Sequence, residues 1–153
     1  MKDIKALIQE HPFFAGLETA YLDLLAGCAS NAHFKTGDFL FQEGGAADHF
    51  YLLRAGRVAL ELTVPGRSPV VIQTLQTREV IGWSWLFPPY VWQFDARALE
   101  TVRATAFDGK CLREKCRDNH DLGYELAMRS ANIMLQRLQA TRLQLLDLYG
   151  QRP

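Results

Sequence analysis

Short runs of aromatic and branched residues, separated by glycine, fill the middle of the chain. The runs at 39–41 and 50–53 have the length of β-strands, and Gly37, Gly44–Gly45 and Gly56 lie beside them. Glycine adopts a positive φ without steric cost, so these positions mark tight turns. The pattern predicts several short strands joined by sharp corners.

A β-hairpin is predicted immediately afterwards. Residues 58–64 and 70–75 are rich in branched side chains, and they flank the turn-rich segment PGRSP at 65–69. Together with the preceding runs, they predict that strands dominate from about residue 32 to residue 107.

Helical periodicity occupies both ends of the chain. Near the start, apolar residues recur at helical spacing on both sides of the His11–Pro12 break, which predicts two short helices that end near Gly27. Towards the other end, Asp108 is placed to cap a short helix, and Asp118 or Asn119 to begin a long one.

The predicted long helix carries two apolar stripes. One stripe steps alternately by four and three residues, as the seam of a coiled coil does, and comprises Ala127, Ala131, Met134, Leu138, Thr141, Leu145 and Leu148. This seam predicts a parallel homodimer through the helix. The second stripe is expected to pack on the strands and comprises Leu122, Leu126, Ile133 and Leu135. The alternative is one amphipathic helix that packs only on its own core.

Size and charge limit the classes of function. The chain has 153 residues, which is enough for one domain with its own core. We expect a single domain over 1–153, with N-terminal helices in 1–30, the strands in 31–107 and C-terminal helices in 108–150. The 17 basic and 17 acidic residues are scattered along the chain, so we predict no DNA binding by this chain alone.

The cysteines and histidines suggest no bound metal. Cys28, Cys111 and Cys116 are odd in number and lack the spacing of a metal site, so we expect no disulfide framework and a cytoplasmic location. His49 has no second ligand near it, so we predict no metal centre and no cofactor. No apolar run approaches the roughly 20 residues that span a bilayer, so we predict no membrane segment. Nor do the residues suggest a catalytic triad, and we predict a protein that is not an enzyme.

Residues 37–58 fit one specific pattern, G-D-x-[aliphatic]-[aromatic]-x-E-G-x-x-A-D-x-[aromatic]-[aromatic]-x-[aliphatic]-x-x-G-x-V. This pattern resembles the signature of cyclic-nucleotide-binding domains, as in the Crp/Fnr-like catabolite activators. The resemblance implies a mainly β fold with flanking helices: a double-stranded, jelly-roll-like β-roll with N-terminal helices and a long C-terminal dimerisation helix. It also implies a regulatory or sensory module in signal transduction. The winged helix-turn-helix of those transcription factors has no counterpart in this chain, so we expect the output to pass through an unknown partner protein.

The segment that corresponds to the ligand cassette of that family departs from the family pattern. The family runs approximately G-E-L-A-L, followed after a variable loop by P-R-A-A-T-V-R-A; its glutamate holds the ribose and its first arginine the cyclic phosphate. Aligning Arg97–Ala98 with the closing R-A places Trp83 on the glutamate and Trp92 on the phosphate arginine. The resemblance therefore implies a weakened site for cyclic AMP or GMP, because a buried phosphate needs a paired cation. Arg54, Arg57 and Arg97 are the substitutes to be considered.

Six aromatic residues lie close together in this segment and form what we call the aromatic cassette: Trp83, Trp85, Phe87, Tyr90, Trp92 and Phe94. Three interpretations of this cassette are open. The aromatic side chains fill a vestigial pocket, or they line a modified pocket for an apolar or planar ligand, or they contact a partner protein. In the run 137–141, R-L-Q-A-T resembles R-L-Q-V-T of the catabolite activators, in which the threonine contacts the purine across the dimer. The corresponding threonine here is a ligand contact or a residue that sets the register of the seam. The candidate pocket residues are Gly82, Trp83, Ser84, Trp85, Tyr90, Trp92, Gln93 and Thr141.

The sequence therefore favours a regulatory module with a modified pocket that does not bind cyclic AMP or GMP in the usual way. Two alternatives stay open. The chain is a genuine cyclic-nucleotide-binding signalling protein, or it is a structural dimer or scaffold whose pocket is permanently closed.

Overall fold

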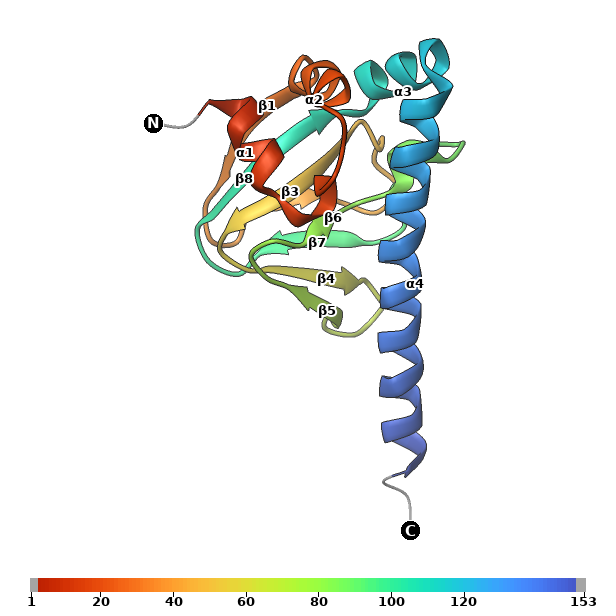
Figure 1. Cartoon of the computed structure of the whole chain (residues 1–153). Helices are drawn as coiled ribbons and strands as arrows, with labels where there is room; N and C mark the ends of the chain where they lie inside the picture. The colour runs from red at the N-terminus through yellow and green to blue at the C-terminus, as the bar shows by residue number, and fades with distance from the viewer. Residues whose placement is uncertain (1–2, 151–153) are drawn as a thin grey trace.

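Two antiparallel sheets of four strands form the centre of the molecule, and helices cover one end and one side (Figure 1). The computed structural model describes residues 3–150. One sheet has the order β1-β8-β3-β6 and the other the order β2-β7-β4-β5. The strands are β1 (Ala29–Phe34), β2 (Phe39–Phe41), β3 (His49–Ala55), β4 (Val58–Leu62), β5 (Val70–Leu75), β6 (Val80–Ile81), β7 (Asp95–Ala98) and β8 (Val102–Asp108). The helices are α1 (Ile4–Glu10), η1 (Pro12–Phe14), α2 (Thr19–Ala26), η2 (Ser84–Leu86), α3 (Gly109–Asp118) and α4 (His120–Gly150).

The mainly β fold with flanking helices is confirmed, and so is the hairpin, which pairs β4 with β5. Gly56 shows why a glycine is needed at the corner between β3 and β4. Its φ is +95°, and a Cβ there would lie 2.4 Å from the carbonyl oxygen of Thr101. Any other residue would clash with the neighbouring backbone, so the corner depends on glycine.

The alternation of side chains along β3 divides the apolar interior into two cores. Phe50 and Leu52 point to one side and pack with the N-terminal helices and the start of α4. Tyr51 and Leu53 point to the other side, into the space between the two sheets. Phe50 stacks on Phe107 of β8 with 4.6 Å between ring centroids, which joins β3 firmly to its neighbour.

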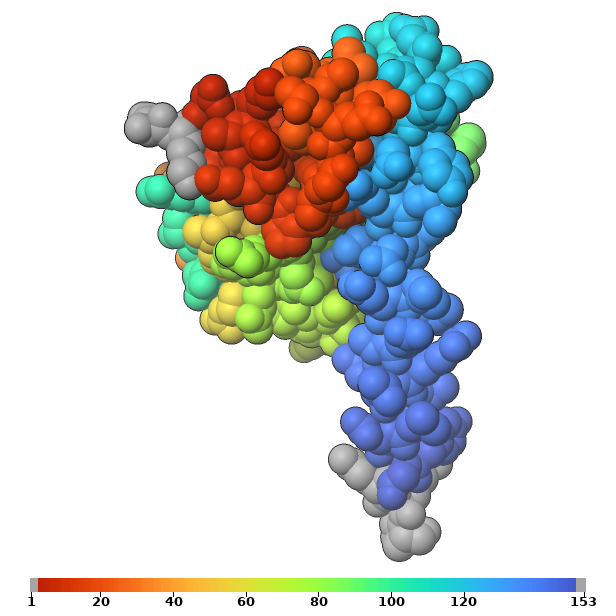
Figure 2. All heavy atoms as spheres, viewed as in Figure 1, coloured from red at the N-terminus to blue at the C-terminus, as the bar shows by residue number. Residues whose placement is uncertain are grey.

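Helix α4 packs on the roll along its first half and extends beyond it along its second half (Figures 1 and 2). The Asn119 side chain accepts a hydrogen bond from the N–H of Leu122 (3.1 Å), as the sequence predicts for the start of this helix. Leu122 and Leu126 are buried in the first core, and Ile133 packs against it. The prediction that Leu135 also packs on the strands is wrong, because its side chain is half exposed. The helix turns by about 100° per residue, which carries Leu135 away from the line that Leu122 and Leu126 begin.

A disulfide joins Cys28, in the short link between α2 and β1, to Cys111 in α3. The expectation of no disulfide is therefore wrong. The two residues are 83 apart in sequence, and only the antiparallel pairing of β1 with β8 brings the ends of these strands together. The cysteine count thus no longer supports a reducing compartment, and the cytoplasmic location stays a prediction. No helix within residues 3–150 is both long and apolar enough to cross a membrane.

Candidate functional site

The segment between β6 and β7 forms the candidate site. It begins at Gly82, where φ is +95°, continues through η2 and returns to the sheet at β7. A Cβ on Gly82 would lie 2.6 Å from the ring of Trp92. The glycine therefore provides the space that the indole ring of Trp92 occupies.

Trp92 is part of the core between the sheets. Its side chain is 4% exposed and stacks on Phe41, with 3.6 Å between the ring centroids and 7° between the planes. Its backbone is held on both sides, because its N–H donates to the carbonyl of Gly45 (3.0 Å) and its carbonyl accepts from the N–H of Gly44 (2.9 Å). The position that the resemblance assigns to a phosphate-binding arginine thus carries a buried, well-anchored aromatic ring.

Trp83 has a different environment. It is only partly buried, and its ring meets Phe94 edge-on at 6.3 Å. These two rings form one wall of a cavity of about 390 Å³ between the roll and α4. The other lining residues are mostly apolar and comprise Leu60, Ile72, Gln73, Met134, Arg137, Leu138 and Thr141.

Arg137 is the charged group of this cavity. Its side chain is 9% exposed, its Nη2 donates to the carbonyl of Val80, and its guanidinium lies 5.0 Å from the centre of the Trp83 ring. Burial lowers the pKa of Arg137 to about 10, against the opposing effect of the Glu79 carboxylate. The guanidinium therefore remains charged at neutral pH, and its Nη1 has no hydrogen-bond partner among the described residues.

The predicted pocket residues fall into two groups. Trp83 and Thr141 line the same cavity, with Gly82 and Trp92 beside it in the core. Thr141 also donates from its hydroxyl to the carbonyl of Arg137 (2.8 Å), one helical turn earlier.

The other predicted residues do not line this cavity. Ser84 is buried, and Trp85 stacks on Phe50 in the core under the helices, 5.2 Å between centroids. Tyr90 lies under the guanidinium of Arg113, 4.1 Å from it, at a different place on the surface. Gln93 is exposed and donates to the carbonyl of Val91 (3.2 Å).

None of the arginines considered as a substitute for the phosphate arginine is free. Arg97 forms a two-bond ion pair with the buried carboxylate of Glu61, with distances of 2.8 and 3.0 Å. Arg57 bonds Glu100 (3.3 Å), and Arg54 bonds the side chain of Asn31 (3.2 Å). The buried cation at the cavity is instead Arg137, which sequence reasoning missed as a site residue because an arginine in mid-helix is usually exposed to solvent. Its position in the run 137–141 was the available signal.

Comparison with known proteins identifies the family. The model of the cyclic nucleotide-binding domain matches residues 31–119, which is more than half of the chain. The chain belongs to the cyclic nucleotide-binding domain family. The matched part of this cyclic nucleotide-binding domain begins within β1 and covers the rest of the roll and α3.

The domain is similar to a curated transcriptional regulator and to several proteins of known structure. It is 24% identical over 135 residues to the CRP-like cAMP-activated global transcriptional regulator of Mycobacterium tuberculosis; the match covers 88% of this chain and 58% of that protein. A Geobacter metallireducens structure named for cyclic nucleotide binding is 31% identical with a TM-score of 0.80, covering 88% of this chain and 98% of the other. The N-terminal domain of a transcriptional regulator from Streptomyces coelicolor is 25% identical with a TM-score of 0.68, covering 88% and 94%. The chain thus spans little more than half the length of the curated relative.

Proposed function

We propose that this domain is a non-catalytic regulatory module that does not bind cyclic AMP or cyclic GMP in the usual way of its family. One observation carries the proposal. Trp92, at the position that the resemblance assigns to the phosphate arginine, is stacked on Phe41 and 4% exposed, so its ring fills this end of the pocket.

The charges around the site support the same conclusion. A cyclic phosphate carries a full negative charge, and its transfer to a buried site without a paired cation costs several kcal/mol. The loss of a two-bond arginine partner typically weakens binding by about 2–5 kcal/mol. Arg97 cannot take over this role without leaving Glu61, which is 3% exposed, as an unpaired buried carboxylate.

The cavity between Trp83, Phe94 and α4 is the proposed ligand site of the module. Its volume of about 390 Å³ and its mostly apolar lining suit a planar or apolar molecule. In this proposal the aromatic cassette has two roles. Trp92 fills the inner end of the pocket, while Trp83 lines the cavity beside α4.

We further propose that α4 carries the signal through a homodimer. The second half of the helix bears exposed leucines on the predicted seam, Leu138, Leu145 and Leu148. A ligand beside α4 would shift the dimer between two arrangements by its difference in affinity for them. The response would then pass to a partner protein.

Titration calorimetry with cyclic AMP and cyclic GMP tests the proposal. We expect no binding in the micromolar range by the native protein. We expect weak binding after the double change Trp83→Glu and Trp92→Arg, because it restores the carboxylate and the guanidinium that the family pattern has at these two positions. The matched control, Trp83→Phe, keeps an aromatic ring and gains no polar group. Micromolar binding by the native protein would overturn the proposal in favour of a genuine cyclic-nucleotide sensor.

A further inference from the structure

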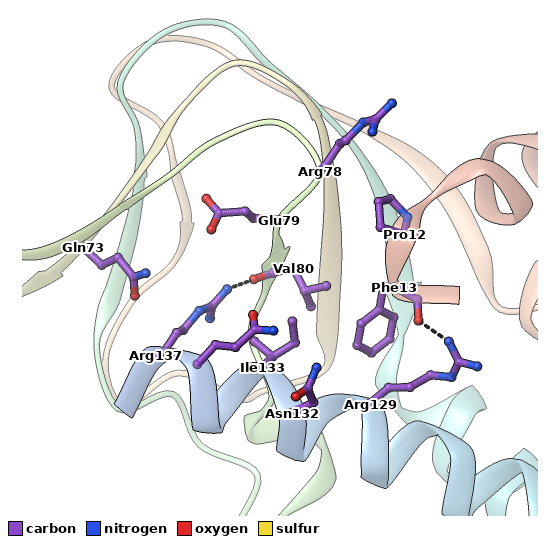
Figure 3. Close-up of a pocket in the computed structure, with 11 residues that line it drawn as sticks. Pro12, Phe13, Gln73, Arg78, Glu79, Val80, Arg129, Asn132, Ile133 and Arg137 are labelled. Atoms are coloured by element: carbon purple, nitrogen blue, oxygen red, sulfur yellow. Dashed lines mark hydrogen bonds between the residues drawn. The ribbon is translucent and has the colours of Figure 1, made fainter. Parts of the chain in front are cut away.

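A second cavity lies on the other side of Arg137, between η1, the turn from β5 to β6, and α4 (Figure 3). Its volume is about 510 Å³. Four charged side chains line it: Arg78 on the turn, Arg129 and Arg137 on α4, and Glu79. The three cations point in different directions: the guanidinium of Arg137 lies at the inner end, that of Arg129 donates to the carbonyl of Phe13, and that of Arg78 points outwards from the turn, away from Arg137 (Figure 3). The nearby amide groups of Gln73 and Asn132 add uncharged donors.

Two of these cations form no ion pair with a carboxylate of residues 3–150. Arg137 forms no ion pair with a described residue, and its buried Nη1 has no acceptor. The side chain of Arg78, on the exposed turn, also forms no hydrogen bond or ion pair with another side chain or backbone group of residues 3–150. Arg129, by contrast, is engaged, because it pairs with Glu125 (3.3 Å) and donates to the carbonyls of Phe13 (2.7 Å) and Ala15 (3.0 Å).

The one carboxylate of the lining is held in place elsewhere. Glu79 accepts a hydrogen bond from the N–H of Gln76 at 2.6 Å, within its own turn. No direct ion pair joins Glu79 to Arg137 within the described residues, although the charge of Glu79 still acts on the guanidinium. A buried guanidinium without a direct counter-ion is unfavourable, and an anion from solution would relieve the penalty.

We propose that this cavity binds a small anion that carries a carboxylate or a phosphate group, held by Arg137 at its inner end. The exposed side chain of Arg78, which points outwards in the structure, turns inwards to contact the anion at the mouth. The planar guanidinium of Arg137 uses Nη2 on the carbonyl of Val80, and its Nη1 is buried without an acceptor among the described residues. In the proposed complex the guanidinium rotates so that Nη1 reaches the anion. The partly apolar floor, formed by Pro12, Phe13, Val80 and Ile133, accommodates a short carbon skeleton.

The position of Arg137 couples this site to the aromatic cavity. Arg137 and Gln73 line both cavities, so each contributes to the wall between them. An anion that draws the guanidinium away from the Trp83 ring changes the surface that the aromatic cavity presents. The anion site itself does not depend on what the aromatic cavity binds.

Thermal melting with inorganic phosphate and with succinate, each matched in ionic strength by sodium chloride, tests the proposal. For a dissociation constant near 1 mM, about 10 mM of the anion shifts the unfolding equilibrium about elevenfold and raises Tm by about 3–5 °C. A response to phosphate alone assigns a phosphate ligand, and a response to succinate alone assigns a carboxylate. Either result supports the site.

Two variants and a matched control establish where the anion binds. Arg78→Asn keeps a residue that tolerates the positive φ of 78° but loses the cation, and Arg137→Gln loses the inner cation. We expect each to reduce the shift in Tm by half or more. Arg67→Asn removes an exposed arginine from the loop between β4 and β5, outside the cavity, and should leave the shift unchanged. If Arg137→Gln does not fold, Arg78→Asn still decides the question.

Tryptophan emission provides an independent measurement. Binding should change the emission of the native protein, because Arg137 moves relative to Trp83, and the change should disappear in Trp83→Phe. The absence of any shift in Tm with both anions would overturn the proposal. An equal shift in the native protein, Arg78→Asn and Arg67→Asn would also overturn it, because it would show only the general stabilising effect of salts.

Discussion

Replacement of Trp92 by alanine examines the feature on which the proposed function depends. Removal of a buried tryptophan side chain typically costs about 3–5 kcal/mol. Two details place Trp92 in the upper part of this range. The stacked contact with Phe41 is lost as well, and the backbone bonds to Gly44 and Gly45 hold the loop so that the space cannot collapse easily. We expect a loss of about 4–5 kcal/mol in the free energy of unfolding, or about 8–20 °C in Tm.

Urea denaturation followed by circular dichroism measures this loss, with Trp83→Ala as the matched control. Trp83 is the same residue type nine positions earlier, but it is only partly buried. Its replacement should cost less than about 2 kcal/mol. A loss below about 1 kcal/mol for Trp92→Ala would refute the reasoning, since Trp92 would then line an open pocket rather than fill a core.

A double-mutant cycle with Gly82→Ala sharpens the same prediction. In the native protein, a Cβ at Gly82 would strain the positive φ and would also clash with the Trp92 ring at 2.6 Å. In the Trp92→Ala background only the strain remains. Gly82→Ala should therefore cost about 1–2 kcal/mol less in that background, whereas equal costs would show that the ring does not press on Gly82.

Three further predictions concern the seam, acid stability and fluorescence. Leu138→Asp should convert the dimer to monomer or aggregate in sedimentation, while Leu143→Asp, which is off the seam and also exposed, should not; a native monomer at tens of micromolar would contradict the dimer. Burial, followed by the charge of Arg78, lowers the pKa of His11 to about 4, below its unfolded value, so this contribution to stability is complete above about pH 6.5 and is lost as the pH falls towards 4. The loss should reach up to about 3 kcal/mol in melts at successive pH values, and an unchanged pH profile in His11→Asn would contradict it. Iodide should quench only a minor part of the tryptophan emission, because Trp85 and Trp92 are buried; ready quenching of most of it would show that they are accessible.

The fold was predictable because its signals are local. Glycine at the corners and alternating apolar residues constrain the backbone directly, and the pattern over 37–58 combines both, which is why it identifies the family. The cap at Asn119 was equally local. Turns, strands and caps depend on a few neighbouring residues, so the spacing of residue types along the chain predicts them.

The candidate site was only partly predictable because its geometry is not local. The separation of Trp83, beside the cavity, from Trp85, in the other core, follows from the short helix η2, which turns the two rings in different directions. The role of Arg137 depends on the carbonyl of Val80, 57 residues away, and the Cys28–Cys111 bond on the pairing of β1 with β8. Contacts between residues so far apart in sequence cannot be predicted from the spacing of residues along the chain.

The Cys28–Cys111 bond also determines how a pulling force would pass between the N-terminal helices and α4. Every strand of the roll lies between these two residues, so the covalent route from the N-terminal helices to α4 bypasses the sheets. Tension applied between α2 and α4 runs through the bond into α3 and leaves the roll unloaded. The 83-residue separation would keep about 280 Å of chain from extending until the bond is reduced. Any pull exerted through α4 by an attached partner would thus act on the helical end of the domain, while the strands that carry the cavities keep their shape.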